Sequence, residues 1–296
     1  MENLEDWKKA GIISAQALEF GKNLIKKGNS LLDTSNKIEE KIKELGGELA
    51  FPVQISLDDI AAHFCPDADD KTVFENQLAN LDIGVAVNGA IGDNALTVDL
   101  SEKNIDLVKA SREALNEAIK IIQIATPLGE IGKVIEETIK SFGFNPVRNL
   151  TGHGLDIYNI HSSPTIPNFN NKDETKLEKG QIIAIEPFAT PGTGFIHEKG
   201  KATLYALIQK KPVRMPFIRQ ILKEIEKYNG LPFTKRWLTA KFGEPKINFA
   251  LQQFKQLDMI KEYPPLVERS NALVSQAEHT LLIDDKVEVL TKVKEG

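Results

Sequence analysis

The stretch that decides the fold is LDIGVAVNGAIGDNAL, residues 81–96. An apolar run leads into Asn88-Gly89, the dipeptide that a two-residue type I′ turn prefers, and a second run follows it. The stretch therefore predicts two antiparallel strands joined by a tight turn at Asn88 and Gly89.

Two aspartates lie within this hairpin. In the register that the turn imposes, Asp82 is opposite Ala95, and Asp93 is opposite Gly84. Because side chains alternate between the faces of a strand, Asp93 shares a face with Ala95 and is a diagonal neighbour of Asp82. Like charges among apolar neighbours are costly, and a bound cation would remove that cost. A solvated hairpin face with two unconnected aspartates is the alternative.

The elements around the hairpin occur twice in the same order. Apolar residues at steps of three and four predict two helices within residues 4–45 and two more within 107–139. The run Ile182–Ile185 is short enough to be a buried strand. We therefore expect an α+β fold of two similar halves around an antiparallel sheet, with a cleft between them.

Composition excludes several classes of protein. The 296 residues include one cysteine, Cys65, so an intramolecular disulfide framework and a cysteine-rich zinc site are excluded. The first residues lack the pattern of a secretory signal, and no apolar run approaches the ~20 residues of a membrane span. We expect a cytoplasmic protein without membrane contact.

One segment differs in charge from the rest. Residues 209–262 contain 12 Lys and Arg against 5 Asp and Glu, a charge of +7, although the chain carries −5. Helical stretches are predicted around 217–228 and 247–260. The segment is interpreted as an inserted basic module.

Three further residues have the chemistry of metal ligands. Glu186 ends one apolar run and Glu278 opens another, so each is either paired with a basic group, bound to metal or exposed at a strand end. His153 lies between two glycines, in a loop where it is either structural or a ligand. His279 follows Glu278 in a strand, so it points to the opposite face.

The five residues, in their order along the chain, resemble the dimetal site of the methionine aminopeptidases, specifically the type II enzymes of the archaeal kind. The resemblance runs nearly end to end. It includes a helical insert of about 60 residues between the last two glutamates. The stretches that carry it are Ala50–Val53, Ile60–Phe64, Asp82–Val85, Gly152–Gly154, Tyr158–His161, Ile166–Asn168, Ile185–Gly194 and Glu278–Thr280.

The resemblance implies the pita-bread fold, in which two pseudo-symmetric halves surround a curved antiparallel sheet. Residues 1–208 with 267–296 would form the catalytic body. Residues 209–266 would form an inserted helical, winged-helix-like subdomain.

The resemblance also implies a ligand set for two divalent ions per chain, which would be cobalt, manganese, iron or zinc. Asp82, Asp93 and Glu278 would hold one ion. His153 and Glu186 would hold the other, with Asp93 and Glu278 bridging. Glu186 would in addition act as general base towards the attacking water.

Four other residues match the family's substrate contacts. By resemblance, His63 would contact the scissile amide and assist proton transfer to the leaving amine, and His161 would bind the carbonyl or its oxyanion. Phe51 and Ile160 would line the methionine pocket. His197 has no role that the sequence supports.

Three positions depart from the usual family pattern. Gln54 stands where asparagine is frequent, Ser163-Pro164 follows His161 where glycine is usual, and Ala277 precedes the last glutamate where phenylalanine is usual. None of them is a predicted ligand, so they bear on pocket shape more than on hydrolysis.

The function expected by resemblance is removal of the N-terminal methionine from nascent proteins and peptides with a small second residue. The alternatives are a prolidase-like Xaa-Pro aminopeptidase and a non-catalytic relative that binds RNA or the ribosome. The basic insert suggests transient ribosome contact as one further partner. The family implies a monomer.

Overall fold

The computed structural model describes residues 3–292. The outermost residues of the predicted body, 1–2 and 293–296, lie outside the described range.

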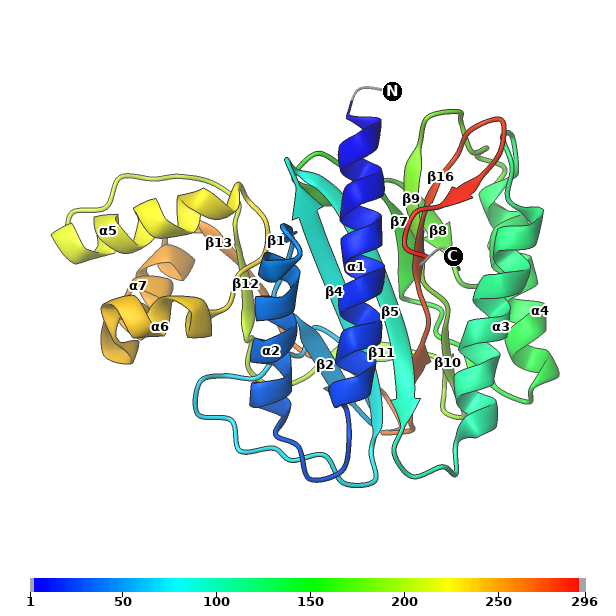
Figure 1. Ribbon diagram of the computed structural model, residues 1–296, viewed down its shortest axis with the longest axis horizontal. Coiled ribbons are helices and arrows are strands. Elements are labelled where there is room, and N and C mark those ends of the chain that lie inside the picture. The colour runs from blue at the N-terminus through cyan, green and yellow to red at the C-terminus, as the bar shows by residue number, and fades with distance from the viewer. Residues whose placement is uncertain (1–2, 293–296) are drawn as a thin grey trace.

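The first half consists of two helices packed on a hairpin. Helix α1 (Leu4–Leu24) lies against strands β4 (Leu78–Val87) and β5 (Ala90–Asp99), and α2 (Leu31–Glu44) packs beside α1 (Figure 1). Their apolar faces and the hairpin enclose one hydrophobic core. Two short strands pair along the other edge of β4, namely β1 (Glu48–Leu49) and β2 (Gln54–Leu57).

The hairpin has the predicted register. Asp82 pairs with Ala95 and Asp93 pairs with Gly84. The turn residues Asn88 and Gly89 have φ values of 51° and 86°, the left-handed conformation that a type I′ turn requires. The prediction from residues 81–96 is therefore confirmed.

The second half repeats this arrangement. Helices α3 (Ile105–Ile121) and α4 (Leu128–Ser141) pack together and cover an antiparallel sheet in the order β17-β16-β9-β7-β8 (Figure 1). Its strands are β7 (Thr151–Asp156), β8 (Asn159–Pro167), β9 (Ile182–Ile185), β16 (His279–Leu282) and β17 (Glu288–Val289). A second hydrophobic core lies between these helices and the sheet.

The two halves meet where β5 runs beside the chain that enters β16. The Glu278 amide donates to the Ala95 carbonyl at 3.0 Å. The Asp93 amide donates to Thr280 Oγ1 at 2.8 Å, and this hydroxyl is also 2.8 Å from the Asp93 carbonyl. Nearby, β10 (Phe188–Thr190) pairs with β6 (Asn145–Pro146) and β15 (Ser275–Gln276). Residues from both halves thus reach the junction.

The insert has its own hydrophobic core at one end of the molecule (Figure 1). Its elements are β12 (Leu204–Leu207), α5 (Pro216–Ile225), the 3-10 helix η1 (Glu226–Tyr228), α6 (Lys235–Phe242), α7 (Glu244–Gln256) and β13 (Ile260–Tyr263). The core includes Tyr205, upstream of residue 209. The division at 209–266 stays a prediction.

The predicted helix over 247–260 is wrong at its end. Helix α7 ends at Gln256, and Ile260 already belongs to β13. The chain reverses at Asp258, whose φ is 51°, and the Met259 amide donates to the Phe254 carbonyl at 2.8 Å. These are features of a left-handed helix end, which apolar periodicity does not reveal.

A buried ion pair joins the insert to the body. Arg236 Nη2 lies 2.7 Å from Glu39 Oε1, and Nη1 lies 3.0 Å from Oε2. The indole of Trp237 donates to the same carboxylate at 2.9 Å. Because removal of one partner would leave a buried charge without compensation, this contact fixes the insert against α2.

A small sheet completes the wall between the insert and the body. Strand β14 (Leu266–Glu268) pairs with β11 (Ile196–Glu198) and with β3 (Ile60–Ala62). No helix among residues 3–292 is long and apolar enough to cross a membrane.

Glu268, at the end of β14, holds two loops beside this wall. Its buried carboxylate accepts hydrogen bonds from the amide and hydroxyl of Thr193, from those of Ser270, and from the Ala272 amide. Although burial raises the pKa of Glu268, the bonds from Ser270 and Thr193 outweigh burial and lower it to about 2.

Replacing Glu268 with Gln should destabilise the protein by about 2 kcal/mol at pH 7, because one amide oxygen cannot accept the same set of hydrogen bonds. A carboxyl group with a depressed pKa stabilises the fold above its unfolded pKa of about 4.3. The difference between wild type and variant should therefore shrink as the pH falls from about 4.5 towards 2. Urea unfolding across this range measures it, with the exposed Glu174→Gln as control. A difference that does not change with pH would contradict the assignment.

Candidate metal centre and substrate pocket

Five side chains converge on one cavity of about 510 Å³. The hairpin supplies Asp82 from β4 and Asp93 from β5. The second half supplies His153 from β7, Glu186 from the residue after β9, and Glu278 from the residue before β16. The expected loop around His153 is wrong, because this residue pairs with Thr165 and Ala184 within the sheet. The structure thus brings together all five residues that the sequence singles out as ligands.

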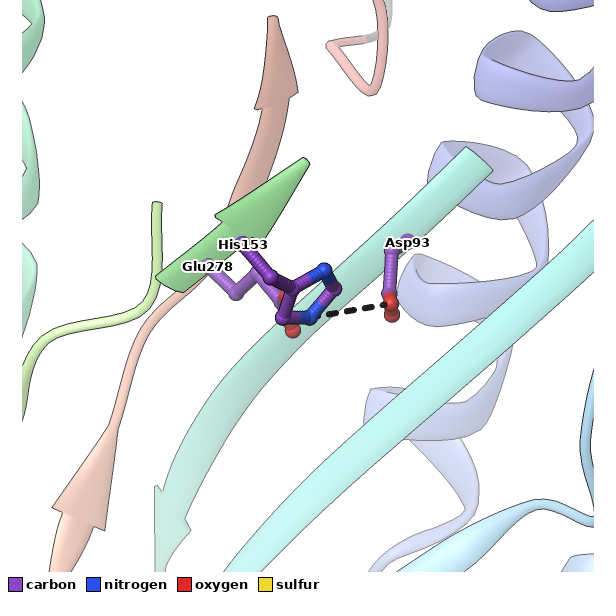
Figure 2. A group of neighbouring side chains, drawn as sticks. All are labelled: Asp93, His153 and Glu278. Carbon is purple, nitrogen blue, oxygen red and sulfur yellow. Dashed lines mark ion pairs between the residues drawn. The ribbon is translucent and has the colours of Figure 1, made fainter. Parts of the chain in front are cut away.

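Three of these residues form a compact group. Asp93, His153 and Glu278 each offer a ligand atom, and these atoms lie within 4.8 Å of one another. Figure 2 shows the three side chains pointing towards a common point, with His153 Nε2 at 3.9 Å from Asp93 Oδ2. The same nitrogen lies 3.5 Å from Glu186 Oε1. This spacing suits ligands around shared cations.

The carboxyl groups repel one another in a buried setting. Burial raises the pKa of Asp82 to about 7. Burial, and then repulsion from the neighbouring carboxylates, raises the pKa values of Asp93, Glu186 and Glu278 well above their ordinary range. Across residues 3–292, no lysine or arginine forms an ion pair with any of the four. The negative charge therefore requires compensation from another source.

Two carboxylate oxygens without hydrogen bonds mark where a positive charge would bind. Asp82 Oδ1 and Asp93 Oδ1 are buried and accept no hydrogen bond. Burial lowers the pKa of His153 to about 3, so the imidazole is neutral at pH 7, which is the form that binds metals. Oxygen ligands with one neutral imidazole suit divalent cations, so the residues present fit a metal centre.

The two other candidate histidines line the same cavity. The ring of His161 lies edge-on to that of His153, with centroids 4.8 Å apart. His63 has a φ of 63°, and its amide donates to Gln54 Oε1 at 2.7 Å. Burial lowers the pKa of His63 to about 4 and also lowers that of His161. Both rings are therefore neutral hydrogen-bonding groups at pH 7.

An apolar part of the cavity adjoins the candidate metal centre. Phe51 and Ile160 are buried and line the cavity. Gly84 provides the room for Phe51, because a Cβ at this position would lie 2.2 Å from the aromatic ring. Gly84, two residues after Asp82 on β4, thus shapes the pocket.

Sequence reasoning gave no role to several other residues of the site. Lys261, Tyr263 and His197 line the cavity. The buried Asn168 donates to the Leu150 and Glu186 carbonyls at 3.0 and 3.1 Å. These residues come from segments distant in sequence, so only the folded chain brings them to the site.

His279 lies away from the cluster, as strand alternation predicts. Its Nδ1 is 3.0 Å from Thr291 Oγ1. The roles of the five ligands, of His63 and His161, and of Phe51 and Ile160 stay predictions.

Comparison with known proteins gives a consistent result. Residues 5–214 match the model of metallopeptidase family M24. A methionine aminopeptidase of Thermococcus onnurineus is 42% identical over 294 residues, which is 98% of this chain and 100% of that relative. The solved methionine aminopeptidase of Thermotoga maritima is 25% identical, with a TM-score of 0.71 over 98% of this chain and 96% of that one. These matches confirm the predicted α+β pita-bread fold.

A second solved structure shares only the fold. The prolidase of Pyrococcus furiosus is 20% identical with a TM-score of 0.63, and the match covers 99% of this chain but 65% of that one.

Replacing Asp93 with Asn tests the centre through stability. Because one of four buried like charges is removed, the metal-free variant should unfold at a higher temperature than the metal-free wild type at pH 8. Manganese or cobalt should raise the unfolding temperature of the wild type by roughly 5 °C near 100 times Kd, and that of the variant by much less. Scanning calorimetry with and without metal measures both effects.

The exposed Asp106→Asn on α3 serves as the matched control and should behave like the wild type. Equal metal-induced shifts in the wild type and the Asp93 variant would rule out Asp93 as a ligand.

Proposed function

The chain belongs to metallopeptidase family M24, and we propose that it is a methionine aminopeptidase that removes N-terminal methionine from peptides and nascent proteins. One observation carries the proposal: the five predicted ligands line the same cavity as the apolar residues Phe51 and Ile160. The 42% sequence identity to a named methionine aminopeptidase, over 98% of this chain, supports the proposal.

The ligand set would hold two divalent ions, with Asp93 and Glu278 shared between them. When bound, such ions polarise the scissile carbonyl and lower the pKa of a water molecule. Their charge would also offset the repulsion among the four buried carboxylates.

The side chains around this centre carry the proton transfers. Glu186 would accept the proton of the attacking water on its carboxylate, which lines the cavity next to His153. The neutral His161 would donate a hydrogen bond to the carbonyl oxygen as negative charge develops there. His63, also neutral, would bind the scissile amide and assist proton transfer to the leaving amine.

Selectivity would follow from the buried pocket. Phe51 and Ile160 offer an apolar slot beside the reacting bond, and a thioether packs well against an aromatic ring. Burial of the methionine side chain would orient the first peptide bond towards the centre.

The finer points stay proposals. Cobalt, manganese, iron and zinc all suit this ligand chemistry, so metal availability would decide among them. We expect a monomer in the cytoplasm.

The wild type should release methionine from Met-Ala-Ser, lose this activity on chelation and regain it when metal is restored. Asp93→Ala should lower kcat/KM by more than about 100-fold. Loss of even a residue that only hydrogen-bonds to a metal ligand typically lowers activity or metal affinity by about 10- to 100-fold. The control Asp106→Ala should leave turnover unchanged. Unchanged turnover in Asp93→Ala would refute the dimetal mechanism.

The same assay separates the alternatives. A prolidase-like enzyme would cleave Ala-Pro or other Xaa-Pro peptides in preference to Met-Ala-Ser. A non-catalytic relative would cleave none of them at any metal concentration.

We propose in addition that the basic insert makes transient contact with ribosomal RNA. Lys235, Arg236 and Lys241 are each paired with a carboxylate, so they offer little free charge. Arg219, Lys223 and Lys246 are exposed and belong to no ion pair within the described part of the chain. These three cations support the proposal better.

Changing Arg219, Lys223 and Lys246 together to Gln should weaken co-sedimentation with ribosomes and reduce its salt slope by up to about three, or about one per lost phosphate contact. A matched triple variant of exposed body lysines, Lys26, Lys103 and Lys176, should bind like the wild type. Identical binding by both triple variants would remove the proposal.

A further inference from the structure

Lys261 extends from the insert to the rim of the catalytic cavity. It lies on β13, two residues before Tyr263, so both side chains share a strand face, and both line the cavity. Lys261 Nζ is 4.7 Å from the centroid of the Tyr263 ring. That ring in turn lies edge-on to His63, with centroids 5.4 Å apart. A positive charge therefore lies one aromatic ring away from a residue that faces the reacting bond.

Among residues 3–292, Lys261 contacts an aromatic ring but no carboxylate neutralises its charge. The adjacent carboxylate, Glu262, is paired with Lys255 on the insert. Over residues 3–292, Lys261 takes part in no ion pair, and its side chain is exposed. An exposed, unpaired ammonium at the rim of a cavity is free to meet a charge on a ligand.

The field of this charge reaches the catalytic histidines. Burial is the main cause of the low pKa of His161, and the charge of Lys261 lowers it further. The pKa of His63 is lowered by burial, by His161 and then by Lys261. Both effects agree with the position of Lys261 near the bond that would be cleaved.

The direction of the substrate decides which part of it meets Lys261. The first side chain would occupy the slot of Phe51 and Ile160, and the scissile bond would lie at His63 and His161. The substrate beyond that bond would then leave along the rim that β13 forms. Besides the four carboxylates of the candidate centre, Glu198 of β11 and Glu262 of β13 line the cavity. Glu262 is paired with Lys255, whereas Glu198 acts on charged substrates in the sense opposite to Lys261.

We propose that Lys261 selects substrates by charge on the C-terminal side of the scissile bond: it favours a carboxylate there and disfavours lysine or arginine. This inference rests on the proposed function. The carboxylate could be the side chain of the third residue or the C-terminus of a short peptide, and both present the same chemistry to the ammonium.

The effect should be modest and sensitive to salt. An exposed ion pair changes binding by about two- to five-fold, and salt at several times 0.1 M screens most of it. The measured quantity is the ratio of kcat/KM for Met-Ala-Glu-Ser-amide to that for Met-Ala-Lys-Ser-amide, with Met-Ala-Gln-Ser-amide as the neutral reference. Met-Ala-Ser as the free acid and as the amide forms the second arm and isolates the C-terminal carboxylate.

Lys261→Gln should lower the Glu-to-Lys ratio two- to five-fold, and Lys261→Glu should lower it further. Glu198→Gln should move the ratio in the opposite direction. Lys246→Gln, an exposed insert lysine, should leave it unchanged. The difference between the variants should diminish at 0.5 M salt.

A change in the side-chain series alone assigns the third residue as the carboxylate that Lys261 meets, and a change in the acid-to-amide ratio alone assigns the C-terminus. If Lys261→Glu alters neither ratio while methionine is still released from the neutral peptide, Lys261 has no such role and the proposed function stands. If the wild type releases no methionine from the neutral peptide at any metal concentration, the proposed function fails and this inference fails with it.

Discussion

The structure depends on one constraint, the burial of four carboxyl groups in a single cavity. Asp82, Asp93, Glu186 and Glu278 repel one another, and burial alone opposes their ionisation. Two hydrophobic cores, one in each half, hold the strands that carry them, so the helices over each sheet supply the free energy that keeps like charges together. The same repulsion is the driving force for binding divalent cations, because a metal ion removes a cost that the fold has already met.

The junction between the halves makes this arrangement precise. The Glu278 amide binds the Ala95 carbonyl, and Thr280 binds the backbone of Asp93 on both its N–H and C=O sides. Two candidate ligands that are far apart in the sequence, Asp93 and Glu278, are therefore tied together through main-chain hydrogen bonds. Asn168 does the same for Glu186 through its carbonyl. Such bonds position side chains without pairing their carboxylates, which leaves the oxygens free for a cation.

The hairpin could be predicted from its local sequence, whereas the convergence of distant residues on one cavity could not. Asn88-Gly89 sets the register, so the shared face of the two aspartates follows from residues 81–96. The addition of His153, Glu186 and Glu278 required the family resemblance, because no local rule brings segments so far apart to one cavity. Helix α6 could not be predicted from apolar periodicity, because only one of its residues, Leu238, is buried. The net charge of residues 209–262 does not reveal that Arg236 is a buried partner of Glu39.

The insert is part of the catalytic wall as well as a separate packed unit. Strand β13 pairs with β12 and leads directly into β14, and its residues Lys261 and Tyr263 line the cavity. Helices α5, α6 and α7 enclose their own core. The Glu39–Arg236 pair attaches this unit to α2. Loss of either partner would leave a buried charge without compensation at this attachment. The insert could vary in its outer charges without loss of the centre, but a change in its attachment would alter the pocket.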